Sequence, residues 1–117
     1  MDAAKRKIEF GDFQTPEELA FKLCERLAAL GFKPDVVVEP TCGVGAFVLA
    51  AARAFPSARS VLGFEVNADY LRALAARLRS DPTSERVALE QADFFSTDWR
   101  AKIDPLEGNL LVLGNFP

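Results

Sequence analysis

The stretch from Val36 to Phe47 (VVVEPTCGVGAF) constrains the fold more than any other part of the chain. Its run of valines indicates a buried strand, and the small residues after Glu39 indicate a tight turn before an apolar helix. This order places the unpaired N–H groups of a helix start beside the carboxyl end of a strand. The sequence therefore predicts a ligand pocket at this junction, suited to a small cofactor with an anionic or polar tail.

Strands and helices are expected to alternate along the rest of the chain. The expected strands are Val36–Glu39, Val61–Glu65, Val87–Gln91 and Leu110–Leu113, and the expected helices begin at Thr15, after Gly45, and at Asn67 or Asp69. The first helix is predicted from leucines at helical spacing and from a capping box between Thr15 and Glu18. A short turn around Trp99 is expected before the last strand. The alternation predicts an α/β fold with a mainly parallel sheet and flanking helices.

Composition limits the classes of function. The chain of 117 residues has a net charge of −3, so it offers no basic surface for nucleic acid by itself. It contains no histidine, which excludes serine–histidine triads and removes the commonest metal ligand, so no metal is expected. Its two cysteines are too far apart for a zinc knuckle. No apolar run approaches membrane-spanning length, so we expect a soluble, cytoplasmic protein without a membrane partner.

A polar residue stands at or just after the end of each predicted strand: Glu39, Glu65, Asp93 and Asn115. The carboxyl ends of parallel strands line one crevice, where ligands bind in doubly wound sheets. We therefore expect these four side chains to share one site. This expectation depends on the order of the elements alone.

The two middle corners of this site suit a nucleoside. Glu65 lies 22 residues after Gly43, near the offset of about 20 residues at which an acid accepts from ribose hydroxyls. The alternative is an acid that caps the next helix or faces water. Asp93 followed by Phe94 suits an adenine, with the acid accepting from the exocyclic amine. The alternative places both Phe94 and Phe95 in the core; we expect one buried and one at the ligand.

The end of the chain suggests a site for an amine. The Asn115 side-chain oxygen and a neighbouring backbone carbonyl together can accept both hydrogens of an amine and orient its lone pair. The alternative is an ordinary turn, which Asn and Pro both favour. A dinucleotide oxidoreductase that binds NAD is a competing hypothesis. Its glycine fingerprint requires Gly or Ala where this chain has Val48, so NAD is the weaker choice.

Together these motifs resemble class I S-adenosylmethionine-dependent methyltransferases, and most closely the DNA adenine-N6 methyltransferases of restriction–modification systems. The matching segments are Phe13-Gln14-Thr15-Pro16, the glycine motif Glu39–Phe47, Glu65-Val66, Asp93-Phe94 and the partial catalytic motif Asn115-Phe116-Pro117. The resemblance covers nearly the whole chain from Phe13 onward, and it implies a Rossmann-like methyltransferase fold.

The resemblance also implies roles for these residues. Thr15 and Glu39 would hold the methionine moiety of S-adenosyl-L-methionine, beside Thr41 and Gly43. Glu65 would bind the ribose, and Val66, Asp93 and Phe94 would hold the adenine ring. Asn115, Phe116 and Pro117 would form the catalytic motif that grips the amine of a flipped adenine.

Two departures from the family pattern shape the expected domain organisation. Phe116 stands where the family has its first proline, and the chain ends at Pro117, where the family continues with an aromatic residue. We therefore expect a flexible arm over residues 1–12 and, over residues 13–117, the cofactor-binding part of a methyltransferase domain cut short after its fourth strand. DNA contacts are expected from regions missing here, and the fragment is expected to be inactive alone. The alternatives are an RNA or protein methyltransferase, or a non-catalytic cofactor-binding or interaction module.

Overall fold

The computed structural model describes residues 14–116. The predicted arm, Phe13 and Pro117 lie outside the described residues. Within the described part, four strands form one parallel sheet in the order β3-β2-β1-β4. Their bounds are Val36–Glu39 for β1, Ser60–Glu65 for β2, Val87–Gln91 for β3 and Leu110–Val112 for β4. The α/β fold with a parallel sheet is therefore confirmed.

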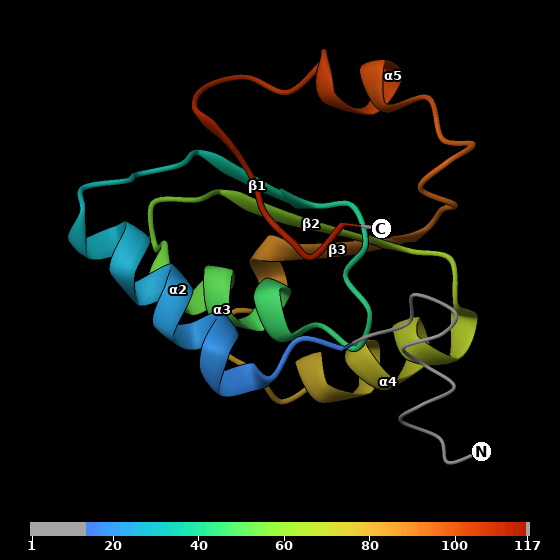
Figure 1. The fold of residues 1–117 in the computed structure, drawn as a ribbon, viewed down its shortest axis with the longest axis horizontal. Helices are drawn as coiled ribbons and strands as arrows, with labels where there is room; N and C mark the ends of the chain where they lie inside the picture. Colours follow the sequence, from blue (N-terminus) through green and yellow to red (C-terminus); the bar gives the residue numbers. More distant parts are fainter. Residues whose placement is uncertain (1–13, 117) are drawn as a thin grey trace.

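Helices cover both faces of this sheet, unequally (Figure 1). The helices α2 (Glu17–Ala29), α3 (Ala46–Ala54) and α4 (Ala68–Leu78) pack on one face, and the short helix α5 (Trp99–Ile103) lies over the other. A 3₁₀ turn, η1 (Ser84–Arg86), leads into β3. Because side chains alternate along a strand, Val37 joins the larger core, whereas Val36 and Val38 join the smaller one with Trp99.

The direction of the chain reverses at β1. From β1 the chain steps outward to β2 and β3 through α3 and α4, and it then returns past α5 to place β4 on the other side of β1. In doubly wound sheets such a reversal opens a crevice beyond the carboxyl ends of the two strands. The fold therefore opens a binding crevice between β1 and β4.

The first helix forms as predicted, but two details of the prediction are wrong. Pro16 is the N-cap residue and no side chain caps the helix, so the capping box between Thr15 and Glu18 is absent. The predicted leucines are mostly exposed: Leu19 is 56% and Leu30 is 65% exposed and Leu27 is only partly buried, whereas Ala20 and Cys24 are fully buried. The partner helix α3 presents small residues, and its Ala50–Ala52 segment is fully buried, so α2 approaches closely through its own small residues.

The predicted turn around Trp99 is a helix. The side chain of Asp98 caps α5 by accepting a hydrogen bond from Ala101 N at 3.2 Å. The Trp99 ring meets Phe64 edge-on, with 5.1 Å between ring centroids. This contact closes the second face of the sheet.

None of the helices in residues 14–116 combines the length and the apolar character that crossing a membrane requires.

Gly45 allows the turn between β1 and α3 to form. It is the N-cap residue of α3 at a φ of 96°, where L side chains are strained. A Cβ added there would lie 2.3 Å from Leu74 Cδ1, and Leu74 is fully buried. The turn therefore depends on glycine for both conformation and space.

We expect Gly45→Ala to lower the free energy of unfolding by more than Gly31→Ala, measured by urea denaturation. Gly31 has the same φ of 96° but nothing within 4 Å of an added Cβ. The Gly31 variant should therefore show only the backbone strain of about 1–2 kcal/mol. The Gly45 variant should lose about 1–3 kcal/mol more through overpacking against Leu74. Equal losses would show that Leu74 moves freely.

Candidate functional site

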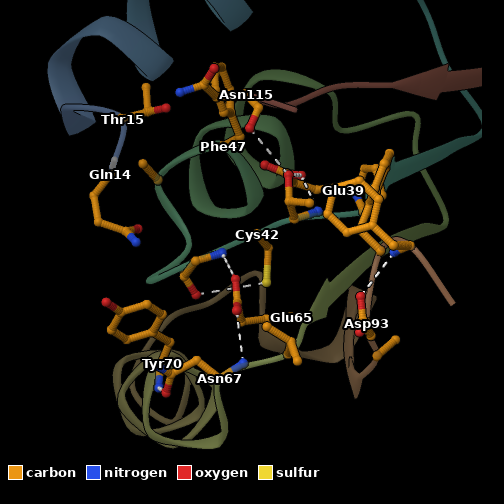
Figure 2. Close-up of a pocket in the computed structure, with 18 residues that line it drawn as sticks. Gln14, Thr15, Glu39, Cys42, Phe47, Glu65, Asn67, Tyr70, Asp93 and Asn115 are labelled. Atoms are coloured by element: carbon orange, nitrogen blue, oxygen red, sulfur yellow. Dashed lines mark hydrogen bonds between the residues drawn. The ribbon is translucent and has the colours of Figure 1, made fainter. Parts of the chain in front are cut away.

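A cavity of about 300 Å³ opens at the carboxyl ends of the strands (Figure 2). Residues from the ends of all four strands line it, together with the segment before α2 and the start of α4. Of the residues predicted for the site, nine line this cavity: Thr15, Glu39, Thr41, Gly43, Glu65, Val66, Asp93, Phe94 and Asn115. Phe116 lies next to it, against Phe94, and Pro117 lies outside the described residues.

Glu39 ends the central strand with a carboxylate that is nearly inaccessible to water. The residue is 3% exposed, and its Oε1 accepts a hydrogen bond of 2.8 Å from Thr41 N. The pKa of Glu39 is raised from 4.5 to about 7, mainly because the carboxyl group is buried. The hydrogen bonds from Thr41 act in the opposite direction, and the nearby Glu65 contributes a smaller increase. Gly114 covers the carboxylate so closely that an added Cβ would lie 2.4 Å from Oε1.

Glu65 fastens the glycine turn to the start of α4. Its Oε1 accepts from Gly43 N at 2.9 Å, and its Oε2 accepts from Asn67 N at 2.8 Å. Asn67 in turn caps α4 by accepting from Asp69 N and Tyr70 N. The alternative role expected for Glu65, an acid at the start of the next helix, is therefore partly confirmed. The same fixed carboxylate lines the cavity and has lone pairs left for two hydroxyl donors.

Asp93 and the two phenylalanines form the wall beyond β3. Asp93 Oδ1 accepts from Phe95 N at 3.0 Å, which fixes the turn. Trp99 Nε1 donates to the Phe94 carbonyl at 2.8 Å. The expectation that one phenylalanine is buried is wrong: Phe94 is partly buried, Phe95 is 80% exposed, and both line the cavity. β3 is an edge strand, and at its carboxyl end Phe94 packs against Trp99 of α5, with 5.9 Å between ring centroids.

Asn115 follows β4 and reaches the same cavity from the opposite side. Its backbone carbonyl accepts from Thr41 Oγ1 at 3.4 Å. The ring of the next residue, Phe116, stacks on Phe94 with 6.2 Å between centroids and an angle of 18°. The structure thus brings the end of β4 against residues that follow β1 and β3.

Several other lining residues had no predicted role in the site, and three of them are polar: Gln14, Asn67 and Tyr70. The Gln14 side chain accepts from Val44 N at 3.2 Å, and Asn67 and Tyr70 form the floor at the start of α4. The signal for Asn67 was present in the sequence, because an N-cap two residues after a strand-end acid must lie near that acid. Gln14 and Tyr70 carry no such signal.

Known proteins are similar to this chain in sequence and in fold. The chain is 43% identical over 113 residues to the type II methyltransferase M.NspV of Nostoc sp., covering 97% of this chain and 23% of the relative. It is 35% identical over 108 residues to the type II methyltransferase M.XamI of Xanthomonas campestris pv. amaranthicola, covering 92% of this chain and 19% of the relative. No protein-family model matches the chain.

Among solved structures, an RNA methyltransferase from Salinibacter ruber in complex with S-adenosyl-L-homocysteine matches with a TM-score of 0.59 and 23% identity. The match covers 74% of this chain and 54% of that one. The chain has a Rossmann-like methyltransferase fold. The resemblance to type II methyltransferases is likewise confirmed, over nearly the whole chain.

This methyltransferase-like chain spans only about a quarter or less of the two type II relatives. Relatives named for other substrates also match. They are an rRNA N(6)-adenosine-methyltransferase of Caenorhabditis elegans and a protein-lysine N-methyltransferase of Saccharolobus islandicus, each 26% identical, over 95 and 84 residues. The fold alone therefore does not identify the substrate.

The buried Glu39 should make the stability of this methyltransferase fold fall as the pH rises from 4.5 to 7. Over that window the folded state keeps a proton that the unfolded chain has released, so raising the pH disfavours folding. The loss should reach at most about 3 kcal/mol, at about 1.36 kcal/mol per pKa unit. Urea denaturation at a series of pH values measures it.

Glu39→Gln should remove this pH dependence, because the amide does not titrate and its oxygen can still accept from Thr41 N. The matched control is Glu85→Gln, which changes an exposed acid in η1 and should leave the dependence unchanged. A slope that survives Glu39→Gln would assign the titration to another group.

Proposed function

We propose that this chain is the S-adenosyl-L-methionine-binding part of an adenine-N6 DNA methyltransferase. The observation that carries the proposal is the gathering of four strand-end groups in one cavity: Glu39, Glu65, Asp93 and Asn115. They follow in the chain order of the methyltransferase motifs, on a methyltransferase fold.

The chemistry of the cavity wall fits this cofactor. At one end, the buried Glu39 carboxylate is held by Thr41 N and lines the cavity together with Thr15, so it suits the ammonium group of the methionine moiety. In the middle, Glu65 is fixed by two backbone N–H groups and suits the ribose hydroxyls. At the other end, Asp93 suits the exocyclic amine of the adenine ring, with Val66 and Phe94 packing against the ring.

Bound S-adenosyl-L-methionine would supply an electrophilic methyl group on a sulfonium. The Asn115 side-chain oxygen and the Phe116 carbonyl accept the two hydrogens of the target amine and turn its lone pair toward that methyl group. Transfer of that methyl group to the amine nitrogen would leave the cofactor as a neutral thioether, and one amine proton would pass to solvent. Pro117, outside the described residues, stays part of the proposed catalytic motif. Positioning supplies most of the rate in such an arrangement.

Similarity to two type II methyltransferases supports DNA as the substrate. Its adenine would be flipped out of the duplex, because its amine is unreachable within the stack. Because the net charge of this chain is −3, we propose that most DNA contacts come from other parts of the protein. An RNA or protein amine is the second candidate, supported by the matches to the rRNA and lysine enzymes. We further propose a cytoplasmic location, supported by two buried cysteines that are both free.

Calorimetric titration tests the cofactor assignment. We expect S-adenosyl-L-homocysteine to bind the chain, NAD not to bind, and Glu65→Gln to weaken binding by about tenfold, because hydrogen bonds to a charged group contribute about 1.5–3 kcal/mol. Glu85→Gln, an exposed acid away from the cavity, is the control and should bind as the parent chain does. Binding of NAD in place of S-adenosyl-L-homocysteine would overturn the assignment.

The affinity for S-adenosyl-L-homocysteine should increase between pH 5.5 and 7. Glu39 must lose its proton to pair with the ligand ammonium, and its pKa of about 7 means that it is protonated in the free chain below that pH. The dissociation constant should therefore fall by up to about tenfold per pH unit. Calorimetry at several pH values measures this slope, and Glu39→Gln should abolish it. An unchanged slope in that variant would mean that Glu39 does not hold the ammonium.

A further inference from the structure

The segment after β4 is held to the cavity wall at three consecutive residues, and we call residues 114–116 the 114–116 loop. Gly114 lies against the Glu39 carboxylate, the Asn115 carbonyl accepts from Thr41 Oγ1, and the Phe116 ring stacks on Phe94. Each partner lines the cavity. The loop that carries Asn115 therefore contacts both ends of the cavity wall.

At the Glu39 end, the contact depends on one hydroxyl proton. Thr41 Oγ1 lies 3.4 Å from Glu39 Oε1 and also 3.4 Å from the Asn115 carbonyl oxygen. A threonine hydroxyl has a single proton to donate, so a strong bond to one acceptor weakens the bond to the other. A cation that pairs with Glu39 competes for Oε1 and frees the hydroxyl for Asn115.

At the opposite end, the contact is a ring stack. Phe94 is fixed by its carbonyl bond from Trp99 and by an edge-on contact with Phe95 at 5.3 Å between centroids. Phe116 covers it and remains 47% exposed. A flat ligand that packs on Phe94 therefore meets the Phe116 ring or displaces it.

We propose that Thr41 and Phe116 are positioning residues through which an occupied cofactor cavity sets the position of the Asn115 side chain. This inference rests on the proposed function, because it takes the cavity to be the S-adenosyl-L-methionine site. The two contacts act at opposite ends of the ligand: the hydroxyl responds to the cation at Glu39, and the ring stack responds to the flat base at Phe94. The coupling is reciprocal, so holding the 114–116 loop in place also raises the affinity for the cofactor.

Nuclear magnetic resonance of the ¹⁵N-labelled chain, titrated with S-adenosyl-L-homocysteine, tests the coupling. The backbone amides of Gly43 and Asn67 report occupancy, since both bond to Glu65 in the cavity wall. The side-chain amide of Asn115 reports the loop. In the parent chain we expect both sets of signals to shift with the same dissociation constant.

The variants are compared at saturation, as judged from Gly43 and Asn67. Thr41→Val keeps the shape and the backbone N–H but removes the hydroxyl, and Phe116→Leu removes the ring stack. In each, the Asn115 signal should lose its response to ligand. Thr41→Ser, which retains the hydroxyl, should restore it. Phe32→Leu, at an exposed phenylalanine beyond the end of α2, is the control for loss of a surface ring.

Two failures are distinguishable. If Gly43 and Asn67 do not respond to S-adenosyl-L-homocysteine in the parent chain, the proposed function is wrong and the coupling with it. If they respond and Asn115 keeps its full response in Thr41→Val and Phe116→Leu, the cofactor site stands and the coupling alone is overturned.

Discussion

The carboxylate of Glu39 occupies a position where a charge is unfavourable, because the residue ends β1 and is only 3% exposed. Burying an ionised carboxylate without partners costs several kcal/mol, so the surrounding structure has to supply them. Thr41 donates from its backbone, and α3 begins a few residues later, with its N-terminal N–H groups near the cavity. Gly114 covers this group so closely that a Cβ there would meet both carboxylate oxygens, so the segment after β4 depends on it as well.

The parallel topology gathers the remaining groups around Glu39. Because β1 lies between β2 and β4, the strand ends on both sides face the same space, and the next strand brings Asp93 to its far wall. The site therefore does not depend on separate long loops folding against one another. Each functional side chain is placed by the end of a strand whose register is fixed by its neighbour.

The sequence predicts the side chains that strand ends and turns position. It does not predict which face of a helix packs against the neighbouring helix or strand. Glu39, Glu65, Asp93 and Asn115 were predictable because parallel strands bring their carboxyl ends together. The buried face of α2 was not, because its leucines outrank Ala20 and Cys24 in hydrophobicity, whereas these two small residues are the fully buried ones against the alanines of α3. The use of Val48 as evidence against an NAD site also fails, because Gly63 on β2 leaves room for this bulky side chain to pack on the sheet. Both failures depend on the size of a residue distant in sequence.

The alanine-built α3 sets the thickness of the layer between α2 and the sheet. It contacts α2 on one side and β1 and β2 on the other, with Ala50, Ala51 and Ala52 completely enclosed. A methyl group added on the side of α3 that faces α2 would push α2 outward and carry Gln14 and Thr15, just before the helix, away from the opposite wall. The width of the cavity mouth therefore depends on the size of helix residues that do not themselves line the cavity.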